Sequence, residues 1–375
     1  MRFQRRNLIF AAAPFLAQQS QAETAAPDVS FVGDGIALPP KAYAALLSTL
    51  AEKPIALDNY SREGIVADLE ARMAGLLGKE SAVFLPTGTL ANHLAVRLLA
   101  NGGKVVVQHE SHLYNDEGDC AQRLSGLNLV PLAQGKAAFT LSDVEDLSAR
   151  AASGRVDAPV GAISIESPVR RRSGEVFPFD EMQRIAAHAR KQGIGLHLDG
   201  ARLFLAPPYT GVSVKQYAAL FDTVYVSLYK YFNATFGAIL AGPRRLIDNL
   251  YHARRMFGGG LPHVWPEAAV AMHYSDGFER RFAKAAGVSE ALLKALGSDG
   301  RFEVQRIKPG SNIATLRVAQ TDANRLMEKL ARQGITIARP RPAANGLDLS
   351  LTTNETILRR GVADLAAAFR VAVEG

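Results

Sequence analysis

Residues 194–202 read IGLHLDGAR and place an acid, Asp199, at the carboxyl end of a short apolar strand. Open α/β sheets bind their ligands at that edge. A carboxylate there is costly to desolvate unless a cation meets it, and the protonated ring nitrogen of a cofactor is one such cation. The other interpretation is a plain ion pair between Asp199 and Arg202. The stretch therefore predicts a strand end that carries either a ligand-binding acid or a local ion pair.

A lysine, Lys230, follows the next apolar strand, residues 223–228, about 30 residues after Asp199. A lysine amine that loses its proton can form a covalent bond with an aldehyde. It can also simply extend to water from a strand end. Because one strand–helix–strand unit separates Asp199 from Lys230, we expect both at the same sheet edge. Together they indicate a covalently bound cofactor.

Two further loops are predicted at this edge. Residues 86–89 (PTGT) join a buried strand to the start of a helix, where Gly88 permits close backbone approach and Thr87 and Thr89 can cap. Free amides and the helix dipole attract phosphate at such a turn. His112 follows the next strand, and it could stack on a cofactor ring or exchange protons, although a loop histidine is usually only solvated.

The wider pattern alternates strands and helices. Apolar runs at 104–108, 127–132, 160–166, 195–198, 223–228 and 237–241 predict strands, and helical spacing occurs at 142–153 and 180–192. Beyond residue 265 helices extend to about 296, strands follow at 302–307 and 314–318, then helices at 323–333 and 355–373. This pattern predicts an α/β domain with a mostly parallel sheet and a small C-terminal α+β domain.

The N-terminus predicts export. Residues 1–22 combine Arg5-Arg6, a short apolar run and a small-residue cleavage site, which is typical of a twin-arginine signal peptide. A disordered tail on a cytoplasmic protein is the alternative. We expect a signal at 1–22, an N-terminal arm at 23–50, a large domain at 51–265 and a small domain at 266–375. The mature protein would then be periplasmic or exported, with no membrane segment after signal removal.

Charge and cysteine content limit the partners. The net charge is +7, and removing residues 1–22, which hold three arginines and no acid, leaves +4. The basic residues are scattered, so we expect small anions as partners and no nucleic acid. The single cysteine, Cys120, excludes an internal disulfide and a cysteine-based zinc site, and no metal is expected.

In chain order, these residues resemble the threonine aldolase/β-eliminating lyase family of fold-type-I pyridoxal-phosphate (PLP) enzymes. The resemblance extends over roughly residues 58–260 and is carried by residues 58–60 (DNY), 84–92 (FLPTGTLAN) and 196–202 (LHLDGAR). It implies a fold-type-I PLP-dependent transferase-like fold. It also implies a small-molecule amino-acid substrate and a homodimer or homotetramer.

The resemblance assigns roles at the cofactor. Lys230 would bind PLP covalently, Asp199 would meet the pyridine nitrogen, and His112 would stack on the ring. The phosphate would lie at the turn formed by Thr87, Gly88 and Thr89. Lys230, His112 and Asp199 are therefore the candidate catalytic residues.

The substrate would be held by other residues. Arg202 is expected to contact a cofactor or substrate anion, and Tyr60 to reach an active site across the dimer. The sequence departs from the family where arginines are expected, at Pro262 and near Leu349. The arginine cluster 170–172, centred on Arg171, is a candidate replacement, and a solvated basic loop is its alternative.

The expected reaction is cleavage of a β-hydroxy-α-amino acid of the threonine type to glycine and an aldehyde. His112, or a water that it orients, would take the β-hydroxyl proton.

The family usually has small residues around the lysine, whereas residues 229–233 read YKYFN. This difference favours a first alternative, a β-eliminating lyase or an aminotransferase of the same fold. The missing arginines favour a second, an exported non-catalytic binding protein, and a dinucleotide-binding dehydrogenase is the generic α/β alternative. The last lacks its glycine fingerprint in this sequence.

Overall fold

A mixed, mostly parallel sheet forms the centre of the protein. The structure is a computed structural model that describes residues 29–156, 158–319 and 322–374. Within them the central sheet has the order β2-β8-β7-β6-β5-β3-β4. Strand β8 is antiparallel to both neighbours, β2 and β7, and the other adjacent pairs are parallel. The strands are β2 (Ser81–Leu85), β3 (Lys104–Gln108), β4 (Leu129–Leu132), β5 (Val160–Glu166), β6 (Gly195–Asp199), β7 (Thr223–Ser227) and β8 (Ala238–Gly242).

Helices cover both faces of this sheet because its strands are apolar on both sides. In β7, Val224 and Val226 pack into a large core, while Tyr225 between them packs into a second core on the opposite face. The large core includes side chains of α2 (Gly64–Leu77), α6 (Leu141–Ala152), α7 (Phe179–Gln192) and α9 (Val214–Ala219). The opposite face is covered by α3 (Gly88–Leu99), α5 (Cys120–Ser125), α10 (Arg244–Ile247) and α11 (Leu250–Met256).

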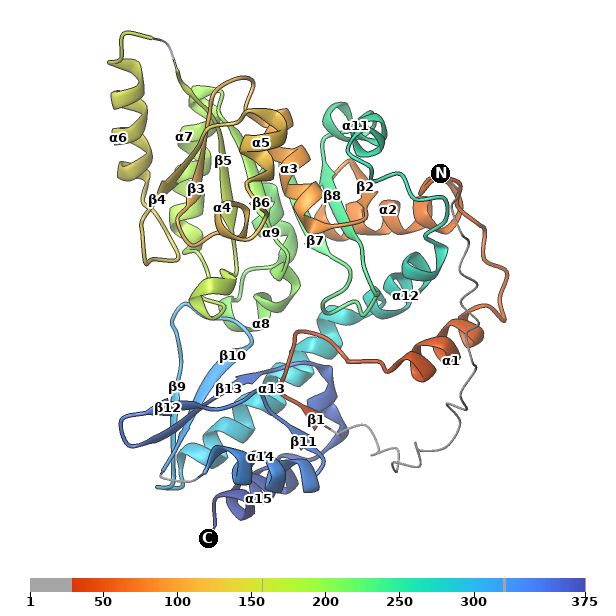
Figure 1. Ribbon diagram of the computed structural model, residues 1–375, viewed down its shortest axis with the longest axis vertical. Helices are drawn as coiled ribbons and strands as arrows, with labels where there is room; N and C mark the ends of the chain where they lie inside the picture. Colours follow the sequence, from red (N-terminus) through yellow and green to blue (C-terminus); the bar gives the residue numbers. More distant parts are fainter. Residues whose placement is uncertain (1–28, 157, 320–321, 375) are drawn as a thin grey trace, which may run out of the picture.

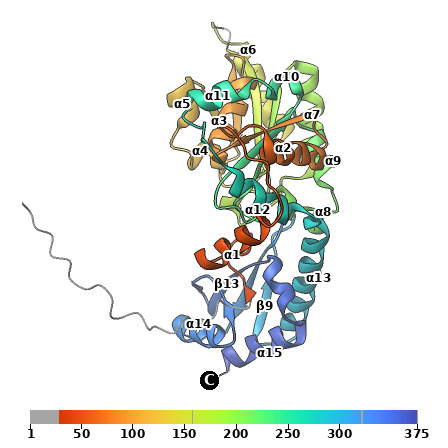
Figure 2. The same ribbon diagram turned by 90° about the vertical axis from the view of Figure 1, so that its right-hand side faces the viewer.

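A second unit lies below the central sheet (Figure 1). The long helix α13 (Phe278–Gly297) leads into it from α12 (Trp265–Ser275), as Figure 2 shows. Its antiparallel sheet has the order β12-β13-β10-β9 and packs against α13, α14 (Ala323–Arg332) and α15 (Val362–Val373). The strands are β9 (Phe302–Gln305), β10 (Ile313–Val318), β12 (Arg341–Ala343) and β13 (Gly346–Thr352). The predicted fold class, a mostly parallel α/β unit with a smaller α+β unit, is confirmed.

The N-terminal segment lies against the second unit. Strand β1 (Val29–Ser30) pairs in parallel with β11 (Ile335–Thr336), and α1 (Pro40–Leu50) contacts α12. The expected signal peptide at 1–22 lies outside the described residues. The domain boundaries at 50 and 265 stay predictions. In the described part of the chain, no helix has the length and apolar character to cross a membrane.

The helix and strand predictions needed small corrections. The predicted closing helix at 355–373 is two elements, a 3-10 helix η3 (Glu355–Arg359) and α15, because Arg360 and Gly361 adopt extended backbone between them. The strand expected at 127–132 begins at Leu129, and the strand expected at 302–307 ends at Gln305. Two further 3-10 turns, η1 (Arg170–Arg172) and η2 (Leu203–Leu205), and two short helices, α4 (His112–Asn115) and α8 (Pro207–Thr210), occur in loops.

Candidate active site

A cavity of about 580 Å³ lies at the carboxyl edge of the central sheet. The segments that follow β2, β3, β5, β6 and β7 all contribute to its wall, as does the segment that precedes the antiparallel β8. The sequence-predicted residues that line it are Thr87, Gly88, Thr89, His112, Asp199, Arg202 and Lys230. The topology therefore brings together residues that are as much as 143 positions apart.

Asp199 is buried at the end of β6, and both of its carboxylate oxygens accept hydrogen bonds. Oδ1 accepts from the backbone N–H of Ala201 (3.1 Å), and Oδ2 accepts from the Asn92 side-chain amide (2.8 Å). The ion pair with Arg202 that the sequence left open is not formed, because the Arg202 guanidinium pairs with Asp34 instead (2.8 Å). The Asp199 carboxylate thus lines the cavity without a cation from Arg202.

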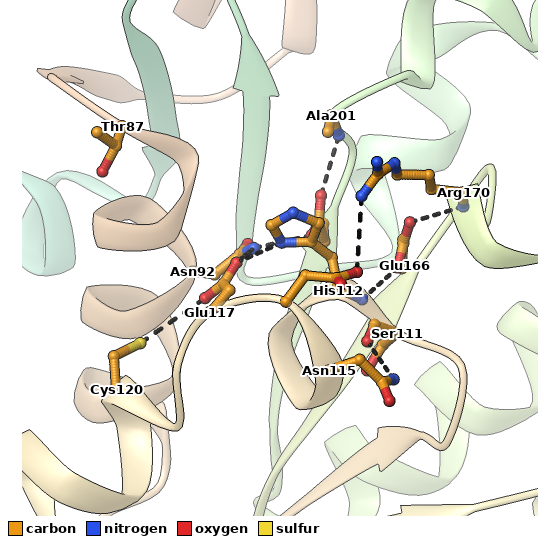
Figure 3. Close-up of polar contacts among 12 residues, drawn as sticks. Thr87, Asn92, Ser111, His112, Asn115, Glu117, Cys120, Glu166, Arg170 and Ala201 are labelled. Carbon is orange, nitrogen blue, oxygen red and sulfur yellow. Dashed lines mark hydrogen bonds and ion pairs between the residues drawn. The ribbon is translucent and has the colours of Figure 1, made fainter.

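Asn92 connects Asp199 to a second buried acid (Figure 3). Its amide also donates to Glu117 Oε1 (2.7 Å), and its carbonyl oxygen lies 2.9 Å from His197 Nε2. Burial lowers the pKa of His197 to about 4, so its neutral ring donates from Nε2 and accepts from the Thr223 hydroxyl at Nδ1 (2.9 Å). Because the Asn92 carbonyl oxygen accepts from His197 Nε2, the Asn92 NH₂ group must face Glu117 and Asp199 and donate to both carboxylates.

His112 is held by Glu117. Its Nδ1 lies 2.9 Å from Glu117 Oε1, and this hydrogen bond raises the pKa of His112. Burial raises the pKa of Glu117 as well, so the pair retains a proton. Because Glu117 Oε1 already accepts from Asn92, the shared proton is best placed on His112 Nδ1. Potential ligand atoms of His112, Glu117 and Asp199 lie within 4.8 Å of one another, and the Asn92 amide donates a hydrogen bond to each of the two acids.

A third acid, Glu166, joins the loops that carry His112 and Arg170. Its carboxylate accepts from the backbone N–H of His112 (2.6 Å) and from that of Arg170 (2.9 Å), as Figure 3 shows. Burial and the neighbouring Asp199 raise the pKa of Glu166. The backbone of Arg170 is therefore fixed relative to the His112 ring.

Lys230 presents its amine among hydroxyl groups. The Nζ atom donates to Ser227 Oγ (3.3 Å) and to Tyr229 Oη (3.2 Å), and it lies 4.3 Å from the centroid of the Tyr229 ring. Among the described residues the amine has no ion pair within 4.0 Å. Tyr229 also lines the cavity and is 45% exposed, so the bulky residue beside the lysine forms part of the cavity mouth.

The start of α3 is arranged for an anion. Thr87 caps the helix by accepting from the Leu90 N–H (3.2 Å), and Thr87, Gly88 and Thr89 all line the cavity. A Cβ on Gly88 would collide with the Tyr225 hydroxyl and lie 2.5 Å from Tyr225 Cζ. Burial and the charge of Asp199 raise the pKa of Tyr225, so its phenol stays protonated beside the helix N-terminus.

These residues fit PLP. The N-terminus of α3 suits a phosphate, because Gly88 has no side chain to block its approach. The buried Asp199 suits a protonated ring nitrogen, and Lys230 supplies a primary amine. All three groups line the same cavity.

We expect Gly88→Ala to weaken PLP binding by at least about tenfold, because the new methyl group must displace Tyr225 or the start of α3. Gly75→Ala in α2 is the matched control, since nothing lies within 4 Å of its Cβ. PLP titration followed by absorbance measures the change. Equal affinity in the two variants would contradict a phosphate site at Gly88.

Two other predicted residues lie elsewhere. Arg171 does not line the cavity; both ends of its guanidinium bind Asp116 (3.1 and 2.6 Å). Tyr60 is also outside the cavity wall of this chain, with its ring 46% exposed and Arg255 4.9 Å from the ring centroid. Their predicted substrate roles stay predictions.

Comparison with known proteins gives one family. The model of the family described as Beta-eliminating lyase matches residues 42–348. The low-specificity L-threonine aldolase of Saccharomyces cerevisiae is 30% identical over 216 residues, which cover 57% of this chain and 55% of the yeast protein. The matched region is thus little more than half of the yeast protein's length.

Two other relatives match over longer stretches. An alanine racemase of Cochliobolus carbonum is 29% identical over 293 residues, or 77% of this chain and 67% of that protein. The crystal structure of a Listeria monocytogenes protein described as a putative L-allo-threonine aldolase has a TM-score of 0.77 and 26% identity. It covers 93% of this chain and 96% of that chain.

Proposed function

Because this chain belongs to the β-eliminating lyase family, which includes the threonine aldolases, we propose that it is a PLP-dependent lyase acting on β-hydroxy-α-amino acids. The proposed products are glycine and an aldehyde. The observation that carries the proposal is one cavity that holds the Lys230 amine, the buried Asp199 and the N-terminus of α3. The cofactor is pyridoxal phosphate, and these three groups would hold it.

When bound, PLP supplies an aldehyde for Lys230 and a conjugated ring that accepts the electron pair released at Cα. Asp199 would hold the ring nitrogen in its protonated form, because its carboxylate is fixed by Asn92 and by the backbone of Ala201. Glu117 binds Nδ1 of His112, which leaves Nε2 to take the β-hydroxyl proton of the substrate. Arg170 and Arg202 both line the cavity and suit the substrate carboxylate.

The test is a product assay on PLP-loaded protein with threonine and allo-threonine. Equal amounts of glycine and acetaldehyde are expected. Ammonia with a keto acid would indicate β-elimination instead, and amino transfer to a keto acid would indicate an aminotransferase. No turnover of any amino acid would support the non-catalytic alternative.

Racemisation is a second candidate. The alanine racemase of Cochliobolus carbonum matches 77% of this chain, a larger share than the yeast threonine aldolase. Racemisation would need one group to remove the Cα proton and another to deliver a proton to the opposite face; the Lys230 amine would serve as one of the two, and neither transfer needs a β-hydroxyl. Loss of optical rotation from L-alanine, without release of glycine from threonine, would favour this function over aldol cleavage.

We also propose that the protein acts as a homodimer or homotetramer. Support comes from exposed apolar side chains near the Tyr60 loop, among them Leu57 (63% exposed) and Met256 (64%). The backbone N–H of Tyr60 bonds to Pro262 O, so this loop and the 256–262 loop lie together. Light scattering measures the mass in solution, and a fully active monomer at nanomolar concentration would contradict the proposal.

Export through the twin-arginine route is proposed on the basis of residues 1–22 alone. Changing Arg5 and Arg6 to lysine should keep the protein in the cytoplasm. Cell fractionation with an antibody would detect this change. An unchanged distribution would favour the cytoplasmic alternative.

A further inference from the structure

We propose that Arg170 is the residue that binds the α-carboxylate of the substrate, and that Arg171 keeps it free to do so. The proposal rests on the proposed amino-acid substrate and extends it to one specific contact. The sequence could not rank the three consecutive arginines at 170–172, because each is a cation on the same loop. Their contacts separate them.

Only Arg170 of the three lines the cavity. Arg171 forms a two-pronged pair with Asp116, and the guanidinium of Arg172 is directed to Glu175 (3.4 Å). Figure 3 shows the Arg170 side chain extending from its backbone toward His112. Glu166 accepts from the backbone amides of both residues, so the base of the Arg170 side chain is held close to His112.

The guanidinium of Arg170 lacks a full partner among the described residues. Its shortest ion-pair distance is 3.8 Å to Asp116 Oδ2, and its side chain makes no hydrogen bond in the described part of the chain. Asp116 Oδ2 already accepts from Arg171 Nε, and Asp116 Oδ1 accepts from Arg171. Arg171 therefore neutralises the carboxylate that would otherwise compete for Arg170.

The other cavity cations are engaged. Arg202 is paired with Asp34 at 2.8 Å, and Lys230 is the proposed covalent anchor of PLP. Asp116, Glu166 and Asp199 line the cavity as well, so an entering carboxylate would be repelled unless a cation faced it. Arg202 gives its Nε donor to Asp34, whereas the Arg170 side chain makes no hydrogen bond among the described residues, so its whole planar fork is open to a carboxylate.

The test measures binding rather than turnover. Alanine and alaninamide differ in the carboxylate, and neither has the β-hydroxyl that aldol cleavage needs. Each is titrated into the PLP-loaded protein, and the shift of the visible absorption band gives its dissociation constant. The change in this ratio between variants reports the carboxylate contact, because the difference in amine basicity between the two ligands is the same for every variant.

We expect Arg170→Gln to lower the preference for alanine over alaninamide by about tenfold, since a partly exposed charge-assisted contact is weaker than a buried one. Arg170→Lys should restore part of the preference. Arg171→Gln should lower it by about threefold, because the freed Asp116 can then pair with Arg170. Arg172→Gln is the matched control and should keep the wild-type ratio.

An unchanged ratio in Arg170→Gln would overturn the proposal, as would an equal loss in Arg172→Gln. If the ratio falls as expected but no amino acid releases glycine and an aldehyde, the proposed reaction fails while the carboxylate contact stands. If glycine and aldehyde are released while the ratio is unchanged, the reaction stands and Arg170 has no such role.

Discussion

Lys230→Ala is expected to lower turnover by at least about a thousandfold, because the variant lacks the amine that anchors the cofactor and accepts protons. The Nζ atom has only Ser227 and Tyr229 as hydrogen-bond partners in the described residues, so the fold loses little when the side chain is shortened. The variant should therefore melt close to the wild-type temperature while losing activity.

Borohydride provides the direct measurement. In the wild-type protein, reduction should collapse the visible absorption band and leave the cofactor attached to Lys230, as located by peptide mapping. Lys191→Ala, at an exposed position in α7, is the control and should keep the band and the label. A label on another lysine in the wild-type protein, or a reducible band in Lys230→Ala, would show that Lys230 is not the anchor.

The sequence was sufficient for the mostly parallel character of the sheet and for several residues at its edge, but not for the strand order or the antiparallel β8. Strands such as 104–108 (KVVVQ) and 160–166 (VGAISIE) carry apolar residues at successive positions, which is the pattern of strands buried on both faces. Because parallel strands end at one edge, the residues that follow them had to converge. Thr87, His112, Asp199 and Lys230 accordingly line one cavity.

The partners of those residues could not be predicted in the same way. Asn92 lies within the stretch that resembles the family, but nothing in its neighbours shows that it bonds to Asp199, 107 positions away. Glu117 follows His112 by five residues, and the turn after α4 is what brings its carboxylate to the ring. The five-residue spacing between His112 and Glu117 is the one signal of this contact in the sequence.

Ion pairs were the least predictable feature. Arg202 is three residues from Asp199, yet it pairs with Asp34 from the N-terminal segment, 168 positions away. The choice between Arg170 and Arg171 likewise depends on where Asp116 lies after β3. Sequence proximity favours neither outcome, because a long flexible side chain pairs with whichever carboxylate the fold places near it.

Asp199→Asn should reduce turnover by about a hundredfold or more and weaken PLP binding, while leaving the fold intact. Asparagine has nearly the same shape and keeps an oxygen for the Ala201 N–H. However, its amide carries no charge to hold the ring nitrogen protonated. Its NH₂ group would also face the Asn92 amide, which donates and cannot accept because its oxygen faces His197.

A double substitution separates charge from hydrogen bonding. If the clash of two donor amides contributes, Asn92→Ala in the Asp199→Asn background should restore part of the PLP affinity but none of the turnover, since the charge stays absent.

Asp222→Asn is the matched control, because Asp222 caps the opposite end of β6 by accepting from the Leu196 N–H (2.8 Å) and lies outside the cavity wall. Absorbance titration with PLP and the product assay give the two measurements. Turnover of Asp199→Asn within about threefold of the Asp222→Asn control, a difference of under 1 kcal/mol, would mean that the reaction does not depend on a charged partner at the ring nitrogen.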